Sequence, residues 1–189
     1  MALQSNLSVL RPILESDLNI LLNWRNSERV RTNMYNDNII TMQEHTNWFL
    51  SEQNSSTNKH LIFEYDGRPL GTVNLTKIDY KNNKCYWGFY IGEIDAPKGS
   101  GLAMGILALD FVFKSLDMHK LCSEAFAFNK ASINYHLKLG FNVEGYFKDH
   151  FFRQAKFEDI VCFAHFRDTW RTTRKLIIQQ CFEGGEQNA

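Results

Sequence analysis

The residues with the clearest chemical potential form a glycine-rich turn between a strand-like run and a long apolar helix. Such a turn presents free backbone N–H groups at the positive end of a helix dipole, and its glycines let the backbone approach an anion closely. A lysine in the turn adds a mobile positive charge. The sequence therefore predicts a phosphate-binding turn that comprises Lys98, Gly99, Ser100, Gly101, Leu102 and Ala103.

A second group of polar residues lies on a predicted helix that ends at Gly140 and Phe141. Asn129, Ser132 and His136 are spaced by three and four residues, so they share one face of that helix. A histidine here can donate a hydrogen bond to a leaving group when its ring nitrogen carries a proton. The alternative is a helix histidine that is hydrogen-bonded in the core and serves packing.

Glu124 is the carboxylate best suited to take up a proton. On the strand-like run 120–128 its side chain lies on the same side as Cys122, Phe126 and Phe128. A carboxylate among apolar neighbours is expected to have a raised pKa, which suits proton transfer near neutral pH. Two alternatives stay open: this side of the strand is partly solvated, or Glu124 pairs with an arginine.

Composition limits the functions that this chain can have. The 189 residues are typical of one domain with a continuous core, and 44% of them are hydrophobic. Lys plus Arg and Asp plus Glu both number 21, so no global field points to nucleic acid or to an acidic membrane. The polar start and the lack of a long uncharged apolar run predict a cytoplasmic protein. Four widely spaced cysteines without a Cys-x-x-Cys pair predict reduced thiols and no metal site.

The elements expected to position these residues include both strands and helices. Alternating large apolar residues in the run 85–92 predict a strand directly before the glycine-rich turn. Thr41-Met42-Gln43-Glu44 is a capping box that predicts a helix ending near Glu52. The other predicted elements are strands 7–10, 60–65, 69–78, 120–128, 143–150 and 156–165, and helices that start at 15, after the turn, at 131 and at 167.

This element order predicts an α+β fold with a mixed, mostly antiparallel central sheet flanked by helices. We expect a single domain over residues 1–182, followed by a polar C-terminal tail, 183–189. The phosphate-binding turn lacks the GxxxxGK[ST] pattern of a P-loop. Three apparently antiparallel strands precede it, which also disfavours a Rossmann unit.

Two motifs in this order resemble the GCN5-related N-acetyltransferase (GNAT) family: Lys98-x-x-Gly101-x-Ala103, and the segment from Asn129 to Phe141. The resemblance implies a GNAT-type domain that uses acetyl-CoA as co-substrate, with the turn gripping its pyrophosphate. It also implies that the second motif lies beside the pantetheine and the thiol. A neutral amine would then attack the thioester directly. The cofactor-binding residues implied are those of the turn together with Tyr90, Ile91, Asn129, Ser132 and His136.

Chemical roles follow from the same resemblance. Glu124 would take the amine proton, His136 would serve the leaving thiolate, and N–H groups near Tyr90 and Ile91 would bind the oxyanion. His136 stands where the family usually has a tyrosine, while Tyr135 comes one residue early. That offset rotates a helical side chain by about 100°, so we assign the position to His136.

The N-terminal half predicts the acceptor. Segments such as Leu22-x-Trp24-Arg25-Asn26, Glu44-His45-x-x-Trp48-Phe49 and Leu75-Thr76-Lys77 resemble the acetyltransferases of pseudaminic acid biosynthesis. Those enzymes acetylate the 4-amino group of a UDP-linked 4-amino-4,6-dideoxy-N-acetyl-altrosamine, a step toward the sugar placed on flagellin. The substrate-binding residues implied are Arg25, His45, Thr76, Lys77 and Tyr90.

Charge and hydrogen-bonding chemistry fit this acceptor. Arg25 and Lys77 suit its diphosphate, whereas His45, Thr76 and Tyr90 suit sugar hydroxyls or the acetamido group. Adjacent strand residues such as Thr76 and Lys77 point to opposite faces unless a bulge intervenes. Arg29 is interpreted as a solvated surface charge.

Two other functions stay open: an N-terminal or ribosomal-protein acetyltransferase, and a non-catalytic acetyl-CoA-binding sensor. The first would favour acidic residues for a basic terminus, and the second would keep the cofactor site without an acceptor site. A homodimer is among the assemblies that the sequence allows. No nucleic-acid or membrane partner is predicted.

Overall fold

The computed structural model describes residues 3–183, and over these residues the chain forms one seven-stranded sheet in the order β1-β2-β3-β4-β5-β7-β6. Neighbouring strands are antiparallel except β4 and β5, which are parallel. The predicted α+β fold with a mostly antiparallel mixed sheet is confirmed. The strands are β1 (Ser8–Pro12), β2 (Lys59–Tyr65), β3 (Arg68–Asp79), β4 (Lys84–Ile91), β5 (Lys120–Phe126), β6 (Asn142–Arg153) and β7 (Lys156–Phe166).

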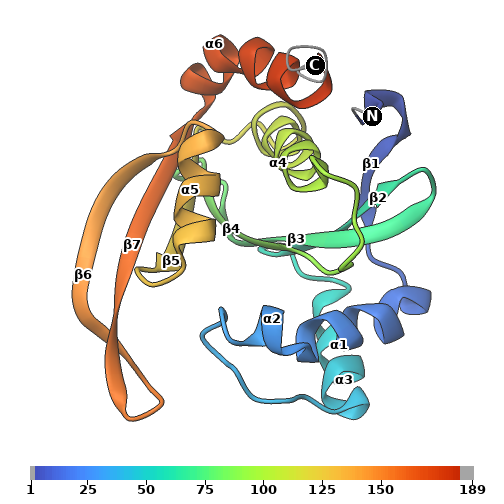
Figure 1. The fold of residues 1–189 in the computed structure, drawn as a ribbon, viewed down its shortest axis with the longest axis vertical. Helices are drawn as coiled ribbons and strands as arrows, with labels where there is room; N and C mark the ends of the chain where they lie inside the picture. Colours follow the sequence, from blue (N-terminus) through green and yellow to red (C-terminus); the bar gives the residue numbers. More distant parts are fainter. Residues whose placement is uncertain (1–2, 184–189) are drawn as a thin grey trace.

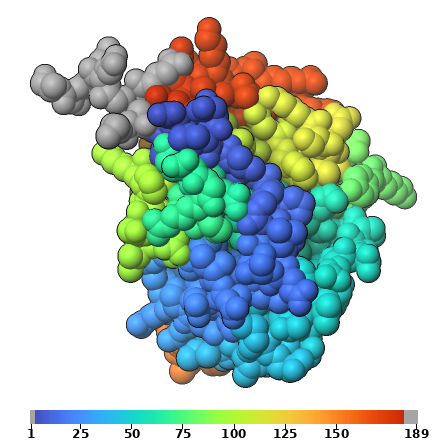
Figure 2. Space-filling view, turned by 90° about the vertical axis from the view of Figure 1, so that its right-hand side faces the viewer, coloured from blue at the N-terminus to red at the C-terminus, as the bar shows by residue number. Residues whose placement is uncertain are grey.

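Helices cover both faces of the sheet, as Figure 1 shows. They are α1 (Leu18–Asn26), α2 (Glu28–Arg31), α3 (Met42–Glu52), α4 (Ser100–Asp110), α5 (Lys130–Lys138) and α6 (Arg167–Ile178), with short turns η1 (Ser5–Leu7) and η2 (Glu15–Asp17) and π-helical segments η3 (Phe111–Ser115) and η4 (Gln179–Glu183). In the space-filling view, the lighter blue and cyan segments fill the bottom and α6, in red, lies at the top, where the dark-blue N-terminal segment reaches it (Figure 2). Within residues 3–183 no helix has the length and apolarity needed to cross a membrane.

Alternation along β4 assigns its side chains to two separate cores. Trp87 belongs to the main core cluster, together with Ala103 of α4 and Leu121 of β5. Tyr90 instead packs against the smaller cluster that contains Leu21 of α1. One face of β4 therefore looks toward α4 and α5, and the other looks toward α1 and α3.

The capping box predicted at Thr41 is confirmed at the start of α3. The Glu44 N–H donates to the Thr41 hydroxyl at 3.2 Å, and the Thr41 N–H donates to the Glu44 carboxylate at 2.7 Å. These reciprocal bonds satisfy two of the N–H groups that the first helical turn leaves without partners.

Strands β4 and β5 pair over a short stretch only. Their parallel register covers Lys84–Lys120, Cys85–Leu121 and Tyr86–Cys122. Beyond Tyr86, β4 continues to pair with β3 and β5 with β7, so the two central strands separate. Both α4 and α5 start shortly after the C-terminal ends of these strands, which places two helix N-termini beside the gap.

Element boundaries differ from the predicted ones at a few ends. The strand predicted over 120–128 ends at Phe126, and the helix predicted from 131 begins at Lys130. The predicted strand 143–150 continues to Arg153. Of the predicted tail 183–189, only Glu183 lies within the described residues, as the last residue of η4.

Gly105 sets how closely α4 and α5 approach. A Cβ added there would lie 2.5 Å from the Tyr135 hydroxyl and 2.7 Å from Leu139 Cδ1. The Tyr135 hydroxyl cannot move away freely, because it donates a hydrogen bond of 2.6 Å to the Gly101 carbonyl. A Cβ on Gly101 would meet Tyr135 Cε2 at 3.7 Å, an ordinary contact.

We expect Gly105→Ala to lower the free energy of unfolding by about 1–3 kcal/mol, because overpacking outweighs the gain of up to about 1 kcal/mol in helix propensity. Urea unfolding followed by circular dichroism measures this. Gly101→Ala on the same helix is the control and should be at least as stable as the wild type, because its Cβ makes only ordinary contacts. Equal stability of all three proteins would contradict the packing argument.

Candidate active site

The gap between β4 and β5 opens into a cavity of about 360 Å³, called here the gap cavity. Its walls come from the end of β4, from β5, from the start of α5 and from the segment around α2. It brings together the predicted residues Tyr90, Ile91, Glu124, Asn129, Ser132 and His136. Five of the eleven predicted cofactor-binding residues and both predicted catalytic residues thus lie around one space.

Two further cavities adjoin the gap cavity. The helix cavity, about 470 Å³, lies between the sheet and helices α1 and α3 and is lined by Arg25, His45 and Tyr90. The edge cavity, about 390 Å³, is lined by Thr76, Lys77 and Glu124. The predicted substrate residues therefore divide between two cavities. Met34 and Asn74 line all three spaces and mark where these spaces meet.

A bulge places Thr76 and Lys77 on the same cavity. The register between β3 and β4 shifts between Thr76 and Asp79, and Lys77 adopts a positive φ of 50°. Because of this irregularity the two adjacent side chains do not alternate across the sheet. The Lys77 ammonium lies over the Tyr86 ring, 4.9 Å from its centroid.

The helix cavity contains two buried polar atoms that have no hydrogen-bond partner within residues 3–183: Nη1 of Arg25 and Nε2 of His45. The other end of the Arg25 guanidinium donates to the Asn36 carbonyl at 2.5 Å. His45 is 5% exposed and stacks on Trp48 at 5.1 Å between ring centroids. Burial lowers the pKa of His45, and the nearby Arg25 charge lowers it further, so the ring is neutral at pH 7.

Glu124 does not have the apolar surroundings that the sequence predicted. Its side chain is exposed and accepts a hydrogen bond of 2.6 Å from the Tyr35 hydroxyl. On the same side of β5, Phe126 is buried but Phe128 is 44% exposed, so this side is only partly covered. The expectation of an enclosed carboxylate is wrong, and the partly solvated alternative is the one observed. Burial and the bond to Glu124 raise the pKa of Tyr35.

His136 is held on both sides by hydrogen bonds. It is 1% exposed, its Nδ1 lies 2.7 Å from the Ser132 carbonyl, and its Nε2 lies 2.7 Å from the Ser123 hydroxyl. A carbonyl can only accept, so Nδ1 carries the proton and Nε2 accepts from Ser123. Burial lowers the pKa of His136 to about 4. This geometry favours the packing interpretation of His136 over the thiolate role.

Arg29 is exposed, as the sequence predicted, but it also has specific backbone partners. Its guanidinium donates to the carbonyls of Ile91 and Gly92 at 3.0 and 2.6 Å. Because the Ile91 carbonyl turns away from β3, the Ile91 N–H on the same strand edge also faces the gap. By the same alternation the backbone N–H of Phe89 faces the gap as well, whereas the backbone groups of Tyr90 face β3. Of the two predicted oxyanion positions, this geometry favours Ile91.

The glycine-rich turn forms the start of α4. Gly99 has a positive φ of 98°, and the Ser100 hydroxyl closes the turn on the Pro97 carbonyl at 2.7 Å. The N–H groups of Ser100 and Ala103 have backbone acceptors, but those of Gly101 and Leu102 have none within residues 3–183. Two free N–H groups at a helix N-terminus fit a phosphate group. Lys98 beside them is exposed.

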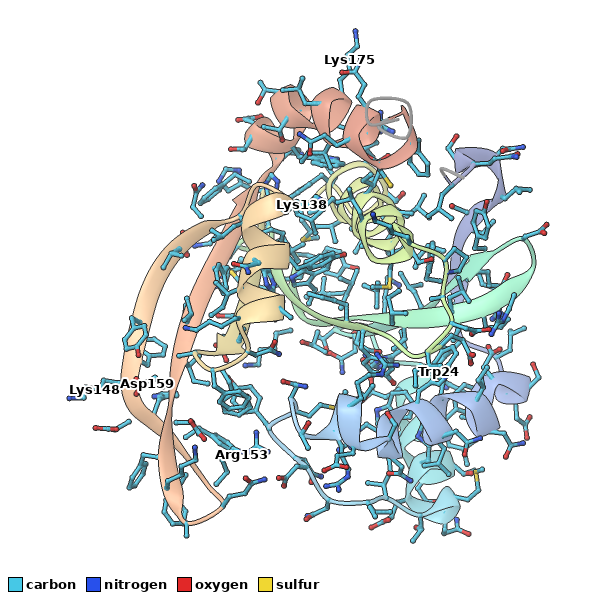
Figure 3. The ribbon with its side chains drawn as sticks, in the orientation of Figure 1. Trp24, Lys138, Lys148, Arg153, Asp159 and Lys175 are labelled. Atoms are coloured by element: carbon cyan, nitrogen blue, oxygen red, sulfur yellow. The ribbon has the colours of Figure 1, made fainter. Side chains whose placement is uncertain are left out.

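Sequence reasoning gave no role to the segment 32–41, which borders all three cavities through Met34 and the edge cavity also through Tyr35. Its anchor is Arg153, which donates to the Thr32 carbonyl and to the Asp37 carboxylate, both at 2.8 Å. Figure 3 shows Arg153 between the β6–β7 hairpin and this segment. The partners lie 116 or more residues apart, so no local sequence signal marks them. Asn74, a polar residue in an apolar strand, was a signal that could have been read.

The sequence is similar to a known family and to individual known proteins. The model of the acetyltransferase (GNAT) domain family matches residues 10–161. The SPbeta prophage-derived uncharacterized N-acetyltransferase YokL of Bacillus subtilis is 28% identical over 123 residues, which cover 64% of this chain and 68% of that protein. Spermidine N(1)-acetyltransferase of Escherichia coli is 23% identical over 166 residues, covering 88% and 89%.

Solved structures share the fold. The spermidine N-acetyltransferase of Vibrio cholerae in complex with CoA and spermine superposes with a TM-score of 0.82 at 18% identity, covering 88% of this chain and 99% of that one. A dodecameric form of the Vibrio cholerae enzyme gives a TM-score of 0.74, also at 18% identity, covering 87% and 96%.

Burial of His136 predicts a dependence of stability on pH. The unfolded chain binds a proton below its ordinary pKa of 6.5, whereas the folded chain does so only near 4. The free energy of unfolding should therefore fall as the pH is lowered from 6.5 to 4, by about 3 kcal/mol for this group alone. Urea unfolding at pH 7 and pH 4.5 measures the difference.

His136→Asn should flatten this pH dependence, whatever its effect on stability at pH 7. His150→Asn, at an exposed position on β6, is the matched control and should keep the wild-type slope. A wild-type slope in the His136 variant would show that the proton is taken up elsewhere.

Proposed function

Because the chain belongs to the acetyltransferase (GNAT) family and is an acetyl-CoA-dependent N-acetyltransferase, we propose that its acceptor is the amino group of a nucleotide-linked sugar. The specific candidate is the 4-amino group of UDP-4-amino-4,6-dideoxy-N-acetyl-altrosamine, which would place the reaction on the route to pseudaminic acid. The acceptor would bind in the helix and edge cavities, and acetyl-CoA in the gap cavity.

The observation that carries this proposal is the polar lining of the helix cavity. Arg25 brings a buried N–H without an acceptor, and neutral His45 brings a buried ring nitrogen without a partner. Buried polar groups of this kind are costly unless a ligand pairs with them. Lys77 adds a second positive charge in the adjoining edge cavity. A polar acceptor with negative charge and hydrogen-bonding groups matches this lining.

The proposal assigns individual residues to steps of the acetyl transfer. The acceptor nitrogen forms a bond to the acetyl carbon, the carbon–sulfur bond breaks, and the amine gives up a proton. Glu124 lines both the gap and the edge cavities, so it can accept that proton. The Ile91 N–H facing the gap can bind the developing oxyanion. The free N–H groups of Gly101 and Leu102 can hold the pyrophosphate. In this scheme His136 holds the Ser123 hydroxyl and the Ser132 carbonyl in place through its two hydrogen bonds.

A polyamine acceptor is the second candidate, favoured by the similarity to spermidine acetyltransferases. A polycation requires carboxylates in its site. The helix cavity has one, Glu44, whose oxygen is already bonded to Thr41 at the start of α3, and the edge cavity adds Glu124, which accepts from Tyr35. The same charge argument disfavours a basic peptide terminus, the acceptor of a ribosomal-protein acetyltransferase. The homodimer stays a prediction.

The test compares acceptors directly. Purified protein is given acetyl-CoA with the UDP-4-amino-4,6-dideoxy sugar, with spermidine or with a basic peptide, and release of the CoA thiol is followed. We expect turnover on the sugar alone. We also expect Arg25→Gln to raise the KM for the sugar about tenfold or more, since it removes a charged donor. The KM for acetyl-CoA should stay unchanged.

Arg68→Gln is the control for the loss of an arginine, because Arg68 pairs with Asp95 and Glu93 away from the three cavities. Turnover on spermidine alone would overturn the sugar proposal in favour of the second candidate. An unchanged KM in Arg25→Gln would remove Arg25 from the acceptor site.

Glu124→Gln should lower kcat by about 10²-fold, the usual contribution of a general base, while acetyl-CoA still binds. Glu144→Gln is the matched control, because Glu144 is an exposed carboxylate bonded to Lys120. Wild-type kcat in Glu124→Gln would refute the base assignment.

A further inference from the structure

Trp87 carries a buried hydrogen-bond donor without an acceptor. The residue is 5% exposed, and its ring Nε1 is fully enclosed with no partner within residues 3–183. Other buried indoles of this chain are paired. Trp24 donates to the Glu93 carboxylate at 2.8 Å and Trp170 donates to Asp110 at 2.9 Å. Trp87 is thus the exception to a pattern that the chain otherwise follows.

The Trp87 ring lies in the wall of the space where the reaction takes place. It lines both the gap cavity and the edge cavity. Phe89 and Phe141 hold the ring at centroid distances of 4.6 and 5.3 Å, the second in a parallel stack. A buried donor left unpaired costs about 1–3 kcal/mol, so a ring fixed in this state calls for an explanation.

The neighbouring donors in this wall are already occupied. The His136 Nδ1–H donates to the Ser132 carbonyl, and the Ser123 hydroxyl donates to His136. The Tyr135 hydroxyl donates to the Gly101 carbonyl. Of these ring and hydroxyl donors, the Trp87 N–H is the one without an acceptor within residues 3–183.

The Trp87 ring also lines the edge cavity, but the side of the sheet on which it packs favours acetyl-CoA as the ligand for its N–H. Trp87 packs with α4 and α5, whose N-termini flank the gap, whereas the proposed acceptor residues Arg25 and His45 lie on the opposite face. We propose that the Trp87 Nε1–H donates a hydrogen bond to the thioester group of acetyl-CoA in the gap cavity. An indole N–H does not give up its proton at neutral pH, so it stabilises charge that builds up as the carbon–sulfur bond breaks. The proposal rests on acetyl-CoA binding and is independent of the acceptor.

Nuclear magnetic resonance of the ¹⁵N-labelled protein tests this assignment. The indole N–H cross-peaks are assigned by single Trp→Phe variants, and the protein is titrated with acetyl-CoA and with desulfo-CoA, which lacks the sulfur and the acetyl group. We expect the Trp87 cross-peak to move downfield with acetyl-CoA and to stay in place with desulfo-CoA. The Trp170 cross-peak should stay in place with both.

The backbone amides of Gly101 and Leu102 distinguish a failure of the Trp87 assignment from a failure of acetyl-CoA binding. They should move with both probes, because both carry the pyrophosphate. If these amides move and the Trp87 cross-peak does not, or if it responds equally to both probes, the Trp87 assignment is overturned and acetyl-CoA binding stands. If neither set moves, acetyl-CoA use itself fails and the proposed function fails with it.

Kinetics provide an independent readout. Trp87→Phe keeps an aromatic ring in the stack and removes only the donor, so kcat should fall about tenfold with the KM of the acceptor unchanged. Unchanged kcat in a variant that keeps the wild-type melting temperature would overturn the assignment. Phe89→Leu, which alters packing at the Trp87 ring and leaves the donor in place, controls for loosened packing and should affect kcat less.

Discussion

The separation of β4 from β5 after three paired residues is the constraint on which the rest of the site depends. Parallel pairing beyond Tyr86 and Cys122 would give the β4 edge groups a partner within the sheet. Because the strands part, the Ile91 N–H faces a cavity, and α4 and α5 start on either side of it. The open edge is covered in part by Arg29, which satisfies two carbonyls at its end.

The same gap connects the two faces of the sheet. Gly88 lines the gap and edge cavities, and a Cβ added to it would meet no atom within 4 Å. On one face the wall is aromatic and its donors are largely paired within the protein. On the other face the helix cavity has cationic and neutral polar groups that are left unpaired. The two faces therefore offer chemically different surfaces, which meet at Met34 and Asn74.

The sequence was most informative where a local pattern decides the outcome. The alternation along β4, the capping box at Thr41 and the glycine-rich turn at Gly99 each depend on neighbouring residues, and each is found as predicted. Glu124 shows the limit of such patterns. Alternation tells which side of β5 the carboxylate occupies, but whether that side is covered depends on Tyr35 and Phe151, which come from distant segments. The bulge at Lys77 and the two bonds of His136 also depend on tertiary contacts. These contacts determine orientation and protonation, which residue spacing alone does not encode.

The segment 32–41 is attached to the molecule by a few side chains that reach its backbone. Arg153 holds Thr32, Arg25 holds Asn36, and Asn26 donates to and accepts from Ile40 at 2.8 and 2.9 Å. Bonds to the main chain do not depend on which side chains the segment carries. Met34 can therefore change while these anchors stay, whereas Tyr35 and Asp37 also attach the segment through their side chains, to Glu124 and Arg153. A change confined to the remaining side chains of the segment would alter the lining of the three cavities and leave its attachment to the framework intact.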